Sequence, residues 1–281
     1  MKPLALIAFL ATFLLLATPG RGQERVLYKE LDSIQLYIEF YSPEKKDTGH
    51  LFPGMVFFFG GGWKREKHYQ FQEHAKYFSK RGIACFLADY RVADKHNTTP
   101  YEALKDAKSA IRFVRKHANE FDVDPSKIIA SGGSAGGHLA AATALIPFYN
   151  DASDDLNISC IPNALVLFNP VIDNGPGGYG YDRIGDNYLL FSPLHNIRTE
   201  APPTIFHLGT KDKLIPVETA EYYKMAMEKA GSRCELKLYE GKGHGFFNYY
   251  HFDAYKETVR ETDIFLQSLG YLDKLPVVKI E

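Results

Sequence analysis

One serine stands in a setting where its hydroxyl could attack a carbonyl carbon. Ser134 is the centre of a Gly-x-Ser-x-Gly pattern, between an apolar run typical of a buried strand and an alanine-rich segment typical of a helix. A tight strand-to-helix turn of this kind holds the serine in a strained backbone conformation and exposes its hydroxyl. We therefore predict that Ser134 is a nucleophile. The alternative is a glycine-rich turn that only packs a helix against a sheet.

A serine nucleophile needs a base, and the base needs an acid that orients it. Asp212 directly follows one predicted strand, and His244 directly follows the next. The carboxyl ends of parallel strands meet at one edge of a sheet, so both side chains are expected near Ser134. We assign His244 as the base and Asp212 as the acid. Asp173 is the second choice for the acid, and Glu218 is disfavoured because it falls inside a predicted helix.

Other histidines compete for the role of base. His138 lies one helical turn after the serine and is expected to pack beside the turn or to touch substrate. His207 lies inside a predicted strand and is expected to be a hydrogen-bonded core residue. His251 lacks the glycines that flank His244, so His244 is preferred.

Acyl transfer also needs N–H donors for the negative oxygen of its intermediate. Residues 59–63, FGGGW, place three glycines directly after a predicted strand at residues 55–59. We expect the backbone N–H groups of Gly61 and Gly62 to bind this oxygen, together with that of Ala135. A packing turn and a phosphate loop are the alternatives. The phosphate loop is disfavoured because no Gly-Lys-Ser/Thr sequence follows.

Alternating strands and helices must position these residues. Strands are predicted at residues 25–30, 34–41, 55–59, 83–88, 127–131, 164–168, 204–208 and 234–239. Helices are predicted at residues 69–81, 100–118, 135–146, 217–230 and 255–269. The helix at 100–118 has the clearest start, since Thr99 and Glu102 form a capping-box pattern around Pro100. This alternation predicts an α/β fold with a mostly parallel central sheet and helices on both faces.

The N-terminus is expected to be a separate segment. Residues 4–17 form an unbroken apolar run after Lys2, too short to cross a bilayer comfortably. The pattern predicts a signal peptide over residues 1–22, a secreted or periplasmic protein and no membrane span. An uncleaved membrane anchor is the alternative. Residues 23–281 are expected to form a single domain, in which residues 171–197 are the candidate for a small lid.

Composition excludes several classes of protein. The 281 residues carry a net charge of −1 and are 45% hydrophobic, which excludes a disordered chain and gives no reason to expect nucleic acid as a partner. Three cysteines are too few for a disulfide scaffold, and none has metal-ligand spacing, so we expect neither a metal nor a cofactor. Cys85 is expected to be a buried free thiol, whereas a bond between Cys160 and Cys234 is left open.

Five segments together resemble a known family. They are FGGGW (59–63), DYR (89–91), GGSAGGHLA (132–140), GTKDKLIP (209–216) and GKGHGFF (241–247). In this order they are similar to the α/β-hydrolase superfamily of esterases and lipases, and more closely to hormone-sensitive-lipase-type carboxylesterases and related bacterial acetyl and feruloyl esterases. The resemblance implies an α/β-hydrolase fold with a triad of Ser134, Asp212 and His244.

The chain departs from that family at three points. Phe59 stands where the oxyanion motif usually begins with histidine, and Gly133 stands where an aspartate usually precedes the nucleophile. The start of the predicted domain is also too short to build the usual N-terminal helical cap. We therefore expect a small lid or none.

Without a large lid, aromatic side chains are expected to form the rim of the substrate pocket. The candidates are Trp63, Tyr179, Tyr181, Phe246 and Phe247. Aromatic rings there could stack on a sugar or on a feruloyl group. The sequence thus predicts a secreted serine carboxylesterase for short acyl esters, acetyl or feruloyl, on a small molecule or a polysaccharide. A prolyl-oligopeptidase-like serine peptidase and a non-catalytic binding module on the same fold are the alternatives.

Overall fold

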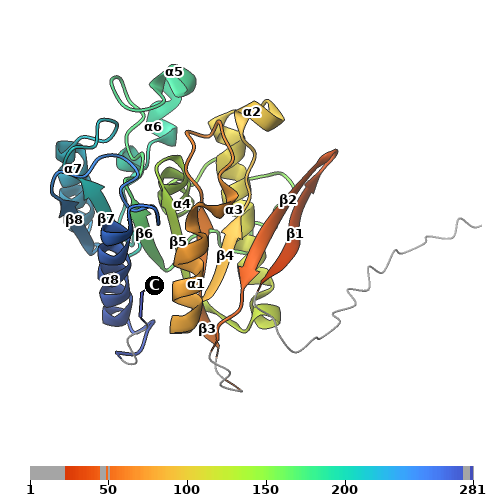
Figure 1. Cartoon of the computed structure of the whole chain (residues 1–281). Coiled ribbons are helices and arrows are strands. Elements are labelled where there is room, and N and C mark those ends of the chain that lie inside the picture. Colours follow the sequence, from red (N-terminus) through yellow and green to blue (C-terminus); the bar gives the residue numbers. More distant parts are fainter. Residues whose placement is uncertain (1–22, 45–48, 50, 275–278, 281) are drawn as a thin grey trace, which may run out of the picture.

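An eight-stranded sheet forms the centre of the molecule (Figure 1). The computed structural model describes residues 23–44, 49, 51–274 and 279–280, so the predicted signal peptide lies outside the described residues. The strands are β1 (Glu24–Leu31), β2 (Ile34–Tyr41), β3 (Phe52–Phe58), β4 (Ala84–Ala88), β5 (Val123–Gly133), β6 (Ala164–Phe168), β7 (Thr204–Gly209) and β8 (Cys234–Tyr239). Their spatial order is β1-β2-β4-β3-β5-β6-β7-β8.

The sheet is mostly parallel, as predicted. β1 and β2 form an antiparallel hairpin, and β2 pairs antiparallel with β4. All pairs from β4 to β8 are parallel. β4 and β6 are short apolar runs in which every residue is buried, which is the pattern of parallel strands covered on both faces.

Helices cover both faces of the sheet (Figure 1). α1 (Gln72–Arg81) and α8 (Phe252–Ser268) pack on one face and share one hydrophobic core. α3 (Pro100–Lys116), α4 (Ala135–Leu145) and α7 (Val217–Lys229) pack on the other face around a second core. Within the described residues, no helix has both the length and the apolar character needed to cross a membrane.

Local signals in the sequence set the ends of these helices. α3 begins at the predicted capping box, where the Thr99 hydroxyl accepts a hydrogen bond from the Tyr101 N–H and the Glu102 carboxylate accepts one from the Thr99 N–H. α1 ends at Gly82, whose φ of 97° is the left-handed conformation that glycine adopts readily. Each of these ends agrees with the sequence prediction.

Short helices occur in several of the connections. The 3₁₀ turns η1 (His68–Phe71) and η2 (Ala118–Phe121) and the short helix α2 (Ala93–His96) join the larger elements. The candidate lid, residues 171–197, contains α5 (Tyr181–Ile184), η3 (Gly185–Asn187), α6 (Tyr188–Phe191) and η4 (Pro193–Asn196). These pieces lie together above the carboxyl ends of the strands (Figure 1).

Candidate active site

Ser134 lies in the sharp turn between β5 and α4. Its φ of 54° and ψ of −120° are a backbone conformation that residues other than glycine rarely adopt. Its backbone is held on both sides, because its N–H donates to the carbonyl of Phe168 at 3.0 Å and its carbonyl accepts from the N–H of His138 at 3.0 Å. The surrounding fold thus maintains the strain and presents the hydroxyl at the edge of the sheet.

Glycines allow this turn to sit against the end of β3. A Cβ added at Gly136 would lie 2.1 Å from the carbonyl oxygen of Phe58, and one at Gly132 would lie 2.3 Å from the carbonyl oxygen of Gly136. Both distances are far below any allowed contact, so the Gly-x-Ser-x-Gly pattern is a packing requirement of this junction.

The structure brings Ser134, His244 and Asp212 together in one hydrogen-bonded chain. The Oγ of Ser134 lies 2.9 Å from Nε2 of His244, and Nδ1 of His244 lies 2.8 Å from Oδ2 of Asp212. A carboxylate can only accept, so Nδ1 carries the proton and Nε2 is left to accept from the serine hydroxyl. This arrangement can take a proton from Ser134 as the hydroxyl attacks a carbonyl carbon.

The acid of this chain is fully buried, and the base is partly open. The carboxylate of Asp212 is 0% exposed, and its Oδ1 accepts from the N–H groups of Leu214 and Ile215 at 2.8 and 3.1 Å. The imidazole of His244 is 25% exposed. Two backbone amides and the imidazole therefore stabilise the buried charge, and part of the imidazole remains accessible to solvent.

Asn169 is a member of the site that the sequence reasoning missed. It follows β6 directly, is 0% exposed and has a φ of 33°. Its Nδ2 lies 3.3 Å from Nε2 of His244, and its Oδ1 accepts from the N–H of Gly245 at 3.4 Å. Its position in the sequence could have identified it, because a polar residue directly after a buried parallel strand lies at the same sheet edge as Ser134.

Two of the three predicted oxyanion donors lie on a loop that approaches the serine, and the third directly follows the serine in the chain. Gly61 and Gly62 have φ values of 141° and 65°, and neither N–H has an acceptor among the described residues. Ala135 is the first residue of α4, so its N–H has no partner within the helix. The loop approaches the nucleophile closely, because a Cβ added at Gly60 would be 3.4 Å from Cβ of Ser134.

A side chain absent from the predictions links this loop to the histidine loop. Oε1 of Gln70, in η1, accepts from the N–H of Gly60 at 2.5 Å. Its Nε2 donates to Oδ1 of Asn248 at 2.9 Å, and Nδ2 of Asn248 donates to the carbonyl of Gly245 at 2.6 Å. The oxyanion loop is therefore coupled through side chains to the residue that follows His244.

Three of the expected rim residues are instead in the core. Trp63 is 1% exposed and packs edge-on against the His138 ring, while Phe246 and Phe247 are 3% and 0% exposed. The expectation of an open rim is therefore wrong for these residues. Phe247 also explains a departure from the family pattern, because a Cβ on Gly133 would lie 2.4 Å from its ring. An aspartate cannot fit there.

The two remaining rim candidates belong to the segment of short helices. Tyr179 and Tyr181 are both half-buried. The guanidinium of Arg183 lies 5.2 Å from the centroid of the Trp63 ring and 5.4 Å from that of Tyr179, and it donates to the carbonyl of Gly62. Arg183 thus fastens this segment to the oxyanion loop.

The competing histidines serve as packing residues. His138 is fully buried, and its Nε2 lies 3.0 Å from the carbonyl of Phe191. His207 is a satisfied core histidine, as predicted, with Tyr239 at 2.8 Å from Nδ1 and Thr262 at 3.0 Å from Nε2. Burial lowers the pKa of each imidazole to about 3, so both are neutral at physiological pH.

The alternative acids and the third histidine lie outside the hydrogen-bonded chain. Asp173 accepts from the N–H of Gly175, Glu218 is in the first turn of α7, and the ring of His251 packs on Tyr250. The described residues contain no group of His, Cys, Asp and Glu side chains that could hold a metal ion. All three cysteines are buried and free, so Cys160 and Cys234 are not bonded to each other.

Comparisons with known proteins agree with this geometry. The BD-FAE family model matches residues 38–173, and the dienelactone hydrolase family model matches residues 179–267. The acetylxylan esterase of Xylanibacter ruminicola is 27% identical over 238 residues, which cover 78% of this chain. The match spans only 45% of that relative's length.

Solved structures give a stronger likeness. Esterase 2 of Thermogutta terrifontis, in a form phosphorylated by paraoxon, is 43% identical with a TM-score of 0.86, and the match covers 91% of this chain and 97% of that one. A butyrate-bound form of the same esterase is 41% identical with the same coverage and TM-score. The chain therefore belongs to the α/β-hydrolase superfamily of serine esterases.

Proposed function

We propose that this protein is a serine carboxylesterase that removes short acyl groups, acetyl or feruloyl, from carbohydrate esters. The observation that carries the proposal is the continuous chain from Ser134 Oγ through His244 to the buried Asp212. A serine in a strained turn, hydrogen-bonded to an oriented imidazole, has the geometry that nucleophilic catalysis requires.

In the proposed first step, the Oγ of Ser134 attacks the ester carbonyl while Nε2 of His244 takes its proton. Asp212 stabilises the imidazolium across the 2.8 Å contact at Nδ1. The N–H groups of Gly61, Gly62 and Ala135 bind the negative oxygen. His244 then returns the proton to the leaving alcohol, which departs as the acyl-serine forms.

In the second step, water attacks the acyl-serine. His244 takes a proton from this water and gives it back to Oγ, so the acid is released and the serine is restored. The 25% exposure of the imidazole gives water access to the acyl-serine from the side of the base. The chain's own residues account for both steps.

Two comparisons support the substrate class. The relative from Xylanibacter ruminicola is an acetylxylan esterase, and the Thermogutta terrifontis esterase has a butyrate-bound form. Butyrate is a short acid, and acetylxylan is an acetylated polysaccharide.

We also propose that residues 1–22 direct export and are removed. The mature protein should then begin at Gln23, which N-terminal sequencing tests.

The nucleophile is tested by Ser134→Ala. We expect this variant to lower kcat on nitrophenyl acetate by about 10⁴- to 10⁶-fold with unchanged folding. Paraoxon should label the wild-type protein at Ser134 and leave the variant unlabelled, as mass spectrometry would detect. Ser131→Ala is the matched control: Ser131 is buried in β5, its Oγ has no partner among the described residues, and full activity is expected. More than a tenth of wild-type activity in Ser134→Ala would reject the assignment.

The acyl group is tested by a chain-length series. We expect kcat/KM to fall from nitrophenyl acetate through butyrate to octanoate, and acetylated xylan to release acetate. Good activity on long-chain esters with none on carbohydrate acetates would overturn the substrate class while leaving the triad in place. An unlabelled serine and no ester hydrolysis would favour a non-catalytic module.

A further inference from the structure

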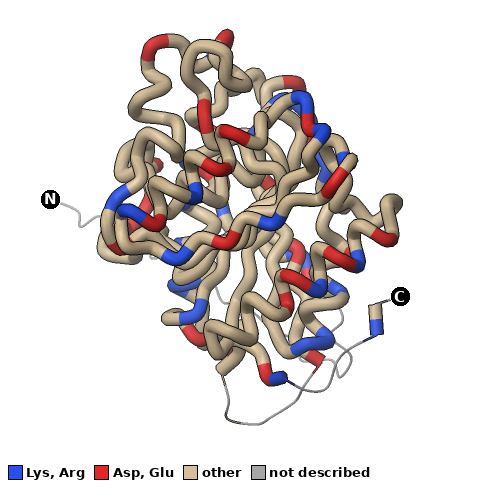
Figure 2. Tube along the Cα trace, turned by 90° about the vertical axis from the view of Figure 1, so that its left-hand side faces the viewer, with Lys and Arg blue, Asp and Glu red and all other residues tan. Residues whose placement is uncertain are grey.

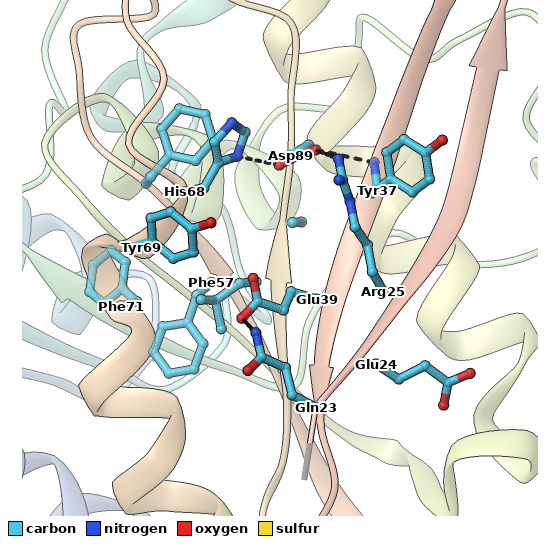
Figure 3. A pocket seen from close by; sticks show the side chains of 13 residues that line it. Gln23, Glu24, Arg25, Tyr37, Glu39, Phe57, His68, Tyr69, Phe71 and Asp89 are labelled. Atoms are coloured by element: carbon cyan, nitrogen blue, oxygen red, sulfur yellow. Dashed lines mark hydrogen bonds and ion pairs between the residues drawn. The ribbon is translucent and has the colours of Figure 1, made fainter. Parts of the chain in front are cut away.

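A pocket lies beside the β1–β2 hairpin, and none of the triad residues lines it. This hairpin pocket has a volume of about 490 Å³ and lies between β1, β2 and the end of β4 on one side and η1 on the other (Figure 3). Its lining includes Arg25 and Glu39 from the hairpin, Asp89 after β4, and His68 and Tyr69 from η1. None of the catalytic assignments uses these residues.

The floor of the hairpin pocket is apolar and its rim is polar. Phe57, Phe59, Phe71 and Leu87 form the floor, and none of them is more than 6% exposed. Tyr69 is the exception among the rings, since 70% of it is exposed and it stands at the edge of the cavity (Figure 3). A floor of this kind with a few convergent polar groups is the usual composition of a small-molecule site.

Asp89, His68 and Arg25 on the rim are already paired with one another. Oδ1 of Asp89 accepts from Nδ1 of His68 at 2.5 Å. Oδ2 accepts from the N–H of Tyr37 at 3.3 Å and lies 3.9 Å from the guanidinium of Arg25. The hydrogen bond that His68 donates to Asp89 raises the pKa of His68. Because these three groups balance one another, they offer hydrogen bonds rather than an uncompensated cation, which suits a neutral ligand more than an anionic one.

The rim keeps further capacity for hydroxyl groups. One oxygen of Glu39 accepts from Gln23 and from the Tyr41 hydroxyl, while its other oxygen has no hydrogen-bond partner among the described residues. A carboxylate can accept about four hydrogen bonds in all. Glu39 can therefore still accept from a ligand.

The hairpin pocket shares a wall with the active site. Phe59 and Tyr69 line the pocket, and the residues that follow them are hydrogen-bonded to each other, since the N–H of Gly60 in the oxyanion loop donates to Gln70 in η1. Gly60 lies next to Ser134, as the 3.4 Å distance from its added Cβ to Cβ of Ser134 indicates. A chain-like substrate held at Ser134 could therefore extend over this wall into the pocket.

We propose that the hairpin pocket is a subsite for a sugar ring of the carbohydrate whose ester is cleaved at Ser134. This proposal rests on the proposed function. A pyranose ring has C–H faces that match the phenylalanine floor and the Tyr69 ring, and a perimeter of hydroxyls that matches Glu39, Asp89 and Arg25. The ligand class is a neutral oligosaccharide.

The subsite is tested by direct binding, using xylotetraose, which carries no ester. We expect xylotetraose to shift NMR signals of the hairpin and η1 in the full-length protein, and Tyr69→Ala to weaken its binding about five- to tenfold, the size of one lost aromatic stack. Tyr222→Ala is the matched control, because Tyr222 is 56% exposed on α7, and it should bind like wild type.

Kinetics give a second measurement. In Tyr69→Ala, kcat/KM for acetylated xylo-oligosaccharides should fall about five- to tenfold relative to kcat/KM for nitrophenyl acetate. Xylotetraose that does not bind, or that binds equally well to Tyr69→Ala, would overturn the subsite. Binding without hydrolysis of any carbohydrate ester would support the subsite and reject the proposed substrate, so the two failures are distinguishable.

Discussion

The amide of Asn169 faces the same nitrogen of His244 that receives the serine proton. With Nδ2 at 3.3 Å, it donates to the neutral imidazole and must lose this bond when Nε2 is protonated. Asn169 therefore favours the neutral base and, through Oδ1 and the N–H of Gly245, fixes the ring in place. It acts as a positioning residue for the proton transfer.

Asn169→Asp tests this role with little change in shape. A carboxylate at 3.3 Å from Nε2 would favour the protonated imidazole, so the acid limb of the kcat/KM–pH profile should move to higher pH by about one unit. Asn163→Asp, at the opposite end of β6, is the control and should keep the wild-type profile. An unchanged profile in Asn169→Asp would rule out the proposed contact with the base.

The triad residues were predictable because their types are restrictive and each follows a predicted strand. Asn169 was not, since an asparagine after a strand is equally common as an ordinary turn residue. The rim prediction was wrong for Phe246 and Phe247 because a sequence does not reveal that the residues after His244 turn back under Gly133. Residue type predicts chemistry here, whereas the direction of a side chain depends on tertiary packing.

At the scale of elements, the 3₁₀ turn η1 connects the two loops that flank the serine. Gln70→Leu removes both of its hydrogen bonds and leaves the Gly60 N–H without its acceptor. We expect kcat/KM to fall about tenfold to a hundredfold, less than the loss of an oxyanion donor itself, because the loop shifts but keeps its N–H groups. Steady-state kinetics on nitrophenyl acetate measure this effect.

The same experiment needs a control for the loss of a surface amide. Gln35→Leu on β2 changes the same side-chain type at an exposed position away from the triad and should keep wild-type kinetics. If Gln70→Leu were as active as Gln35→Leu, the connection between the two loops would have no catalytic importance.

Periodicity and capping predicted most of the elements. The strands predicted at 164–168 and 234–239 coincide with β6 and β8, and the capping box marks the start of α3. The helix predicted at 69–81 is instead divided into η1 and α1, because the first turn is bent to bring Gln70 to the oxyanion loop. The short helices α5 and α6 have too few turns to leave a periodic pattern.

At the scale of the whole molecule, buried neutral histidines make the fold sensitive to acid. Burial lowers the pKa of His74, His138 and His207 to about 3. In the unfolded chain the pKa is about 6.5, so between these two values the unfolded state binds more protons. Stability is therefore full above about pH 6.5 and falls as the pH falls toward 3, by about 1.4 kcal/mol per pH unit for each histidine.

His74→Phe tests this dependence. His74 is packed among Phe57, Phe71, Phe168 and Tyr255, and neither ring nitrogen has a hydrogen-bond partner among the described residues. A phenylalanine removes one titrating group, so the variant should gain about 2 kcal/mol at pH 5 relative to its gain at pH 7. Urea unfolding at the two pH values measures the difference.

The exposed His251 gives the control for that measurement. His251→Phe removes a histidine at an exposed position and should not show the gain at pH 5 that is expected of His74→Phe. A pH-independent effect of His74→Phe would contradict the role assigned to the buried histidines.

Charged residues of both signs alternate on one side of the molecule (Figure 2). On the face shown in Figure 2, acidic and basic residues are interspersed along the described chain without a large region of one sign. This face therefore has no large patch of one sign that would attract a polyanion over a long range. Recognition on this face is left to local contacts, which suits the neutral carbohydrate ester that we propose as substrate.

Burial of the three cysteine thiols affects how fast the protein is damaged under oxidising conditions. Cys85 on β4, Cys160 before β6 and Cys234 at the start of β8 are spread across the sheet, and burial raises the pKa of Cys85 and brings that of Cys234 to about 12. Thiolates are the reactive form, so the buried thiols of Cys85 and Cys234 are poor targets for oxidants and alkylating agents in the closed molecule. Modification of these thiols therefore requires transient opening of the sheet. The rate at which the thiols are lost measures how often the sheet opens.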